Sequence, residues 1–583
     1  MCKPVKIVAT AALLLLWLGV LGLGATAPPH GEVAEAPRTA DELRRQVVEL
    51  GSKGNLTGEL IALFKQYADA CARERLVPAH VSEEFWNRIA ADEVLHDALL
   101  VELYPEYEPG VVACLKTLTE KFGQQFDRHK HLALAFAIAY GRAGQGSTLQ
   151  PGLRHRYASP RRPEPSLEES FAYYLKYEKK AMKMSLVTTP WPMLAFVADN
   201  DIPIEEREWA LGRYAKKASL EKIYYDVPYD TSRIKGEGRI GDRPYTLQNL
   251  LTYGGVCMER AYYTSRVLKS LGIPGMYDCG EGARGGHAWV SWVGRRGKQA
   301  DLLFSGRFDY DKYYRGEVFC PVKGTIILDR DVQLLTAAMV HSYEGWLQAR
   351  IGCHIYDLLD PETRGNVAGL LDGAVRRNPY GADVWRLMAR DVAEGVLSRE
   401  VGEKMYDQMF RHFAAYPDLT FEVLEKILAP RLAAAETEEE KEVRRNLKIL
   451  EQAFKIYEQS KRPDLAVKLR SLQGAYLEAA GRTENALKLY VLAAERYVAD
   501  HYGFLGLFDR AVALMQNLDM RLKYLKIMAE KVPRYRGLAA PGAERETNPA
   551  FVHVVEVYVA ALREAGRSAE ADRWERRIRK KEE

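Results

Sequence analysis

The stretch that decides the fold of this chain runs from Tyr245 to Phe304 and reads YTLQNLLTYGGVCMERAYYTSRVLKSLGIPGMYDCGEGARGGHAWVSWVGRRGKQADLLF. Within it, Gly254-Gly255 allows a tight turn that another backbone can approach closely. Cys257 follows at once, and apolar residues then recur at helical spacing until Gly272, after which Pro274 stops the helix. The pattern predicts a helix that begins at Cys257.

A cysteine at a helix N-terminus is placed for nucleophilic chemistry. The free N–H groups and the helix dipole favour the thiolate, which lowers the pKa of the thiol. The same N–H groups are placed to act as an oxyanion hole, and Gln248 or Tyr253 could add a donor if it is not simply a surface or packing residue. A lone cysteine is more often inert packing, so the assignment of Cys257 as nucleophile depends on its partners.

A histidine with the right chemistry opens the next β-like run, His287 to Val293. Imidazole can take the proton of a thiol near neutral pH and return it to a leaving amine. The chain then turns and comes back through Lys298 to Phe304, a run that contains Asp301. A carboxylate beside the imidazole would fix its tautomer and stabilise the imidazolium.

The parity of the hairpin turn decides whether these two residues can meet. A two-residue turn at Arg295-Arg296 places Asp301 on the face opposite His287. A three-residue turn, at residues 294–296 or 295–297, places both on one face, and the glycine at each end makes such a turn feasible. We expect the three-residue turn.

The order of these motifs resembles the transglutaminase-like superfamily, whose members share a papain-related Cys-His-Asp arrangement. The matching segments are Gly255-Val256-Cys257, Gly272-Ile273-Pro274, His287-Ala288-Trp289-Val290 and Asp301. The resemblance implies an α+β, papain/transglutaminase-like catalytic domain with Cys257, His287 and Asp301 as the catalytic residues. It also implies thioester chemistry at carboxamide or peptide bonds of proteins, with no metal or organic cofactor.

Two departures from the family pattern bear mainly on the aspartate. Many members have an arginine soon after the G-I-P, where this chain has Gly275-Met276-Tyr277, and a Trp and Val before the Asp, where it has Gln299-Ala300. Asp309 and Asp311 are therefore further candidates for the orienting carboxylate.

Helical patterns flank the predicted catalytic domain on both sides. Apolar residues recur at spacings of three and four from Asp41 to about Gly141, and a Gly-, Pro- and Arg-rich linker follows from Gly144 to Ser166. The predicted organisation is a signal peptide at 1–27, an N-terminal helical region at 28–150, the transglutaminase-like domain at 151–330, a helical region at 331–440 and helical repeats at 441–583.

The C-terminal region contains an internal repeat. LKLYVLAAER (487–496) recurs as LKYLKIMAEK (522–531), and Phe454-Lys455-Ile456-Tyr457 recurs at Leu487, so the offsets are 35 and 33 residues. They bracket the 34-residue tetratricopeptide period. One unit, Gly474, Leu477, Ala486, Tyr490 and Ala493, resembles that family's internal spacing, which implies stacked helix pairs with a concave face for a protein partner. A plain helical bundle is the alternative.

The first 27 residues are typical of a secretory signal. Lys3 and Lys6 precede an uncharged apolar run from Ile7 to Gly24, and Ala25-Thr26-Ala27 supplies a cleavage site. The prediction is an exported, periplasmic or extracellular protein with no membrane contact after signal removal. An uncleaved membrane anchor is the alternative, because the apolar run is just long enough to span a bilayer.

Composition and motif searches exclude several other classes of protein. The 583 residues carry 83 Lys+Arg against 79 Asp+Glu, a balance without the electrostatic footprint of nucleic-acid binding. Seven cysteines are too few for a disulfide framework. The run Gly236 to Gly241 spells a dinucleotide motif but is followed by Pro244, which predicts a loop, and no zinc motif occurs.

The sequence therefore predicts an exported transglutaminase-like thiol enzyme that acts on a protein or peptide substrate. It would be a cysteine peptidase or amidase, or an acyltransferase. The alternative is a non-catalytic transglutaminase-like scaffold whose helical repeats bind protein partners.

Overall fold

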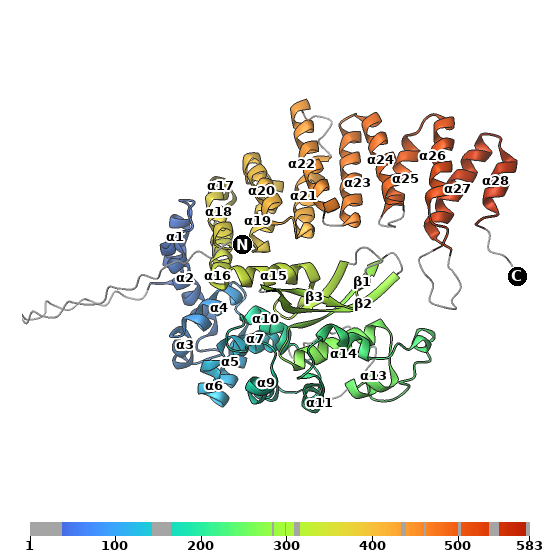
Figure 1. The fold of residues 1–583 in the computed structure, drawn as a ribbon. Helices are drawn as coiled ribbons and strands as arrows, with labels where there is room; N and C mark the ends of the chain where they lie inside the picture. Colours follow the sequence, from blue (N-terminus) through green and yellow to red (C-terminus); the bar gives the residue numbers. More distant parts are fainter. Residues whose placement is uncertain are drawn as a thin grey trace, which may run out of the picture. The chain divides into compact units, whose positions relative to one another are not determined.

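A small antiparallel sheet with a helix on each face positions the site (Figure 1). The structure is a computed structural model that describes residues 38–142, 165–282, 285–297, 299–307, 315–432, 439–459, 462–498, 503–535 and 547–578. The sheet has the strand order β3-β2-β1-β4-β5. Its strands are β1 (Gly275–Gly282), β2 (Gly285–Arg296), β3 (Gln299–Ser305), β4 (Arg315–Cys320) and β5 (Thr325–Leu328).

The two faces of the sheet carry different apolar side chains because successive strand residues point to opposite faces. On one face, Ala288, Val290 and Trp292 pack in a cluster with helix α14 (Cys257–Ser270). On the other, Val293 and its neighbours pack with helix α15 (Asp329–His341). Figure 1 shows α14 and α15 on opposite sides of the sheet.

Helix α14 begins at Cys257, as the sequence predicts. Its last turn closes as a Schellman motif: Gly272 N–H donates to the Lys269 carbonyl at 2.9 Å, and Ile273 N–H to the Leu268 carbonyl at 3.0 Å. Gly272 has φ +71°, a conformation that favours glycine. The G-I-P segment therefore ends the helix and turns the chain directly into β1.

The hairpin turn differs from the predicted one. Arg296 lies opposite Gln299 and Gly294 opposite Asp301, so only Gly297 and Lys298 separate the two strands. The three-residue turn expected at 294–296 or 295–297 is wrong, because β2 continues two to three residues further than expected. Gly297 has φ +66°, which lets a glycine take the first position of a two-residue turn.

Helices precede the sheet, in agreement with the predicted helical region before residue 141. The segment Gly144 to Ser166 predicted as a linker lies almost wholly outside the described residues. The described helices before the sheet are α1 (Ala40–Gly51), α2 (Gly58–Leu76), α3 (Glu83–Ala90), α4 (Glu93–Leu103), α5 (Pro109–Phe122), α6 (Gln124–Arg128), α7 (Lys130–Gly141), α9 (Leu167–Ala181), α10 (Trp191–Ala198), α11 (Ile204–Tyr214), η1 (Leu220–Lys222), α12 (Ile223–Asp226), η2 (Thr231–Lys235) and α13 (Leu247–Tyr253).

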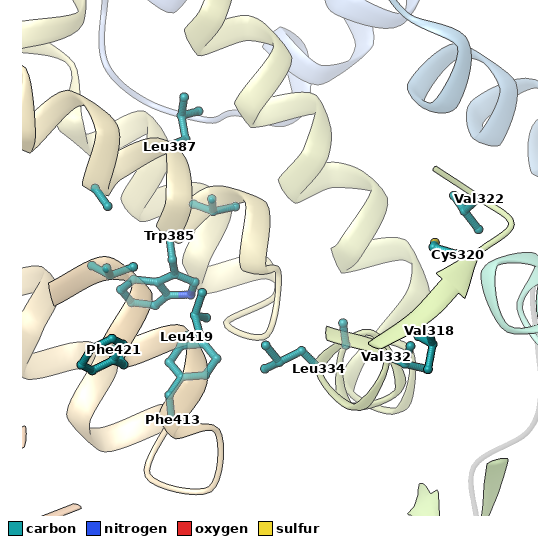
Figure 2. Close-up of a cluster of buried hydrophobic side chains, with 14 of the residues drawn as sticks. Val318, Cys320, Val322, Val332, Leu334, Trp385, Leu387, Phe413, Leu419 and Phe421 are labelled. Carbon is teal, nitrogen blue, oxygen red and sulfur yellow. The ribbon is translucent and has the colours of Figure 1, made fainter. Parts of the chain in front are cut away.

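Helices again follow the sheet. Figure 2 shows Leu334 of α15 between Val318 and Val332 on one side and a cluster around Trp385 on the other; the Trp385 ring centroid is 5.4 Å from that of Phe413. These helices are α16 (Tyr343–Leu358), α17 (Pro361–Asn366), α18 (Ala368–Arg377), α19 (Ala382–Ala393), α20 (Arg399–His412), α21 (Pro417–Leu432), α22 (Glu440–Gln459), α23 (Pro463–Ala479), α24 (Thr483–Tyr497), α25 (Phe504–Leu514), α26 (Leu518–Lys531), α27 (Pro549–Glu564) and α28 (Ser568–Glu575).

Two features of the C-terminal helices can be compared with the predicted repeat: a close helix crossing and the positions of the recurring residues. A Cβ on Gly474 of α23 would lie 2.2 Å from the Tyr490 ring of α24, so the small residue marks a close helix crossing that the tyrosine fills. Leu487 and Leu522 each lie four residues after the start of their helix, at Thr483 and Leu518. Phe454 lies fourteen residues after Glu440, so the 33-residue recurrence does not preserve position within a helix.

The fold class is therefore α+β, with a large helical content and one five-stranded antiparallel sheet. In the part of the chain that the structure describes, no helix combines the length and apolar character needed to cross a bilayer. The predicted signal at 1–27 lies outside that part.

Candidate active site

The start of α14 is held in place by a neighbouring strand-like segment. Gly255 N–H donates to the Pro228 carbonyl, and Asp230 N–H donates to the Gly255 carbonyl, each at 3.0 Å. Gly254 has φ +83°, and a Cβ there would lie 2.5 Å from the Pro228 oxygen. This is the close approach that the glycine pair predicts, and it brings residues 228–230 beside Cys257.

The first turn of α14 is fixed from within. The buried Glu259 carboxylate accepts from Val256 N–H at 2.9 Å and from Arg233 Nε at 3.2 Å. Gly255 leaves room for it, since a Cβ on Gly255 would lie 2.3 Å from Glu259 Cβ. The position of the Cys257 backbone is therefore set by a glycine turn and a carboxylate cap together.

The Cys257 thiol lies against the strand that carries His287. Burial is the largest influence and raises the pKa of the Cys257 thiol, while the backbone N–H groups of Ala288 and Met258 lower it and Glu259 raises it. The net pKa is raised, opposite to the lowering predicted from the helix start alone. The sulfur also interacts with the N–H of Ala288, the residue directly after His287. Ala288 packs on the α14 face of the sheet, whereas the His287 ring stacks on Trp289, so the two residues are neighbours in sequence but their side chains leave β2 on different faces.

The His287 ring is held from the end of β3. Its Nε2 lies 2.7 Å from the Gly306 carbonyl oxygen, and its ring stacks on that of Trp289 with centroids 5.9 Å apart. A carbonyl oxygen can only accept, so Nε2 carries the proton and donates. Neutral His287 therefore has its lone pair on Nδ1.

The structure does not bring Asp301 to His287. Asp301 lies opposite Gly294, seven residues along β2 from His287, which is about 23 Å at 3.3 Å per residue. Its carboxylate accepts from Leu302 N–H at 2.8 Å and Gln333 Nε2 at 3.3 Å and pairs with Arg296 at 2.8 Å. The hairpin register is the reason that the predicted orienting role is not formed. Asp309 and Asp311 lie outside the described residues.

Tyr224 and Gly306, which the sequence analysis did not indicate, also contact the residues of the candidate site. Tyr224 O–H donates to the Ala288 carbonyl at 2.9 Å, and its ring packs on Gly306, where a Cβ would lie 2.3 Å from Tyr224 Cζ. Gly306 also has φ +79°. Tyr224 thus fixes both the strand residue beside the thiol and the carbonyl that holds His287. A glycine two residues after the predicted β-like run is the sequence signal for this.

The two side chains considered as oxyanion donors have other surroundings. Gln248 Oε1 is buried without a hydrogen-bond partner in the described part of the chain. The Tyr253 ring lies under the Arg243 guanidinium, 4.3 Å from its centroid. The backbone N–H donors at the sulfur are those of Ala288, Met258 and Cys257 itself.

The face of the sheet that carries Trp289 also carries a sealed charged cluster. Asp278 and Asp329 are fully buried, and Arg307 lies 4.0 Å from Asp329 and 5.6 Å from the Trp289 ring centroid. Burial raises the pKa of Asp329 to about 6, against the lowering effect of Arg330 and Arg307. Burial and the neighbouring Asp329 raise the pKa of Asp278 well above its ordinary value.

Comparison with known proteins assigns no family. A search with protein-family models finds no match for this chain, and a search of curated proteins finds none either. Among the described residues, no group of three or more His, Cys, Asp or Glu side chains is arranged to hold a metal ion. The assignment of function therefore depends on the geometry around Cys257.

Proposed function

We propose that this chain is a transglutaminase-like thiol enzyme that cleaves or transfers acyl groups at carboxamide or peptide bonds of proteins. Its nucleophile is Cys257 and its base is His287. The predicted signal sequence makes it an exported enzyme. The observation that carries the proposal is the Cys257 sulfur at the start of α14, facing the N–H of Ala288, the residue directly after His287.

The chemistry follows from the protonation states. Because burial raises the pKa of the Cys257 thiol, the thiolate forms in this proposal when His287 takes the proton. The sulfur then attacks the carbonyl carbon, and the imidazolium returns the proton to the departing amine as the C–N bond breaks. Water attacks the thioester to release the acid and regenerate the thiol. An amine in place of water would give transamidation.

Hydrolysis is the favoured outcome because water is the abundant acceptor at a site that solvent can reach. The Cys257 side chain is partly exposed, which gives both substrate and water access. In this proposal the Gly306 carbonyl replaces the orienting carboxylate of a triad. It accepts from His287 Nε2 and so fixes the tautomer of the ring.

The test compares two cysteine variants on a proteome-scale substrate screen. Cys257→Ala should lose all turnover, whereas Cys279→Ala, which removes an exposed thiol from β1 of the same sheet, should keep it. Circular dichroism should show both variants folded. Wild-type turnover by purified Cys257→Ala on any substrate found in the screen would overturn the mechanism.

A second candidate, a non-catalytic scaffold, is favoured by a groove on the C-terminal helices. The groove has a volume of about 780 Å³ and is lined by residues of α22, α23, α24 and α26, with Leu492 62% exposed beside Phe454 and Arg470. Such a surface suits a protein partner, and the repeats would then carry the function. Iodoacetamide labelling of Cys257 at neutral pH no faster than that of a model thiol would favour this candidate.

A further inference from the structure

Arg260, a cation beside the proposed nucleophile, has different surroundings from the other charged residues nearby. Arg260 lies three residues after Cys257, on the same side of α14, because residues three apart on a helix are neighbours. Its Nε donates to the Val227 carbonyl at 2.9 Å, which points the guanidinium along the segment that pairs with Gly255. The buried Tyr224 lies near both, since the Cys257 thiol and the Arg260 guanidinium both influence the pKa of its hydroxyl and Arg260 lies over its ring.

Three tyrosine rings frame this guanidinium. Its central carbon lies 5.0 Å from the ring centroid of Tyr229, 5.8 Å from that of Tyr224 and 6.0 Å from that of Tyr225. Tyr225 and Tyr229 are 61% and 45% exposed. Large side chains this exposed are uncommon in the described chain, and Ile234 of the same loop is another at 71%. The rings hold Arg260 in position and leave an aromatic surface open beside the thiol.

The acidic groups around Arg260 are already paired with other cations. Asp226 pairs with Lys217 at 2.6 Å, Asp230 with Arg239 at 3.2 Å and Glu259 with Arg233 at 3.2 Å. In the described part of the chain no carboxylate lies within ion-pair distance of Arg260. A preorganised, partly buried guanidinium without an acidic partner, one helical turn from a nucleophile, is suited to bind an anionic group from outside the protein.

We propose that Arg260, framed by Tyr224, Tyr225 and Tyr229, binds a carboxylate of the acyl donor and so makes this a site for acidic substrates. This inference rests on the proposed function, because it assigns the substrate class of the Cys257 site. The carboxylate lies close to the carbonyl under attack, since Arg260 and Cys257 are one turn apart on α14. The exposed tyrosine faces take the apolar part of the same substrate.

Two alkylating reagents that differ only in charge test the inference on the full chain. Iodoacetate carries a carboxylate and iodoacetamide does not, and with each the thiolate forms the S–C bond as iodide leaves. Mass spectrometry of tryptic peptides gives the rate at each cysteine separately. The ratio of the iodoacetate to the iodoacetamide rate at Cys257 should fall about threefold to fivefold in Arg260→Gln and should recover in Arg260→Lys.

Matched controls are available in the same molecule. Lys235→Gln removes the same charge from η2, the segment that precedes α13 and α14 in the chain, and should leave the ratio at Cys257 unchanged. The exposed Cys279 provides an internal reference whose ratio should not respond to Arg260→Gln. An unchanged ratio at Cys257 in Arg260→Gln, or an equal fall in Lys235→Gln, would overturn the inference while leaving the proposed nucleophile intact. No labelling of wild-type Cys257 by iodoacetamide would instead overturn the proposed function, and the inference with it.

Discussion

Helices α14 and α15 begin on opposite faces of one sheet, and each begins with an ionisable residue. The first residue of α14 is Cys257, and the first residue of α15 is Asp329. Both positions receive the favourable field of a helix N-terminus, which lowers the pKa of an acid. Yet burial raises the pKa of both groups. At both positions desolvation outweighs the helix terminus.

The two helix starts differ in access and in neighbours. Cys257 is partly exposed, lies against the N–H next to His287 and has Arg260 and its tyrosines beside it. Asp329 is fully buried and meets Asp278 and Arg307. A perturbed ionisable group can act on a substrate only where a substrate can reach it. The comparison shows that a substrate could reach the start of α14, whereas the start of α15 belongs to a buried charge cluster.

Removing the base should have the largest effect on the α14 side. In His287→Ala, turnover at neutral pH should fall about 10⁴-fold to 10⁶-fold, comparable with the loss of a nucleophile in a related triad. The reason is that a thiol whose pKa is raised by burial stays protonated without a base. The measurement is kcat/KM against pH.

The pH dependence separates this role from a structural one. Below the pKa of the thiol, the thiolate fraction rises about tenfold per pH unit. The residual activity of His287→Ala should therefore climb with pH with a slope near one, toward alkaline conditions. A folded variant whose activity does not change with pH would show that His287 does not serve as the base for Cys257.

The second prediction concerns the carbonyl that holds His287. Gly306→Ala should destabilise the protein by about 2–4 kcal/mol, because the new Cβ meets the Tyr224 ring at 2.3 Å and the backbone has φ +79°. It should also reduce activity, since the backbone shift displaces the carbonyl to which the His287 ring donates. Chemical denaturation measures the first effect and kcat the second.

Gly324→Ala is the matched control. Gly324 has φ +65° and nothing within 4 Å of a new Cβ, so it carries the backbone strain without the clash. Its destabilisation should be about 1 kcal/mol, with activity unchanged. Equal losses of stability in the two variants would mean that Tyr224 does not constrain Gly306.

The third prediction tests the sealed cluster on the α15 side. The folded-state pKa of Asp329 is about 6, above its unfolded value, so the folded protein keeps that proton to higher pH. The stability that this shifted pKa contributes is therefore fully present below about pH 4 and is lost as pH rises through about 6. Asp329→Asn cannot ionise, so its stability relative to wild type should rise by roughly 1–3 kcal/mol between pH 4 and pH 8.

Thermal and urea unfolding at several pH values measure this difference. Asp278→Asn should shift the dependence in the same direction, because burial and Asp329 raise the pKa of its carboxyl too. Curves of stability against pH that run parallel for wild type and Asp329→Asn would contradict the assignment of a buried titrating group.

Short sequence motifs predicted those parts of the site that depend on the backbone close by in the sequence. The glycine pair and G-I-P segment gave both ends of α14, and the β-like run gave the strand of His287. The sequence could not weigh burial against the helix terminus at Cys257, because desolvation depends on what packs over the thiol. Tyr224 and Gly306 are 82 residues apart in sequence and meet only in the folded chain.

The smallest expected effect belongs to the residue that the sequence placed in the triad. Asp301 sits about 23 Å along the hairpin from His287, so Asp301→Ala should change kcat/KM less than about threefold. An orienting carboxylate would instead cost roughly 10⁴-fold. Its pair with Arg296 is largely solvent-exposed, with Arg296 68% exposed, so stability should fall by no more than about 1 kcal/mol. Arg296→Ala breaks the same pair and should match it in both measurements. A hundredfold loss of activity confined to Asp301→Ala would mean that the hairpin register in the active enzyme differs from the one described, because only a shift of several residues could bring this carboxylate to the imidazole.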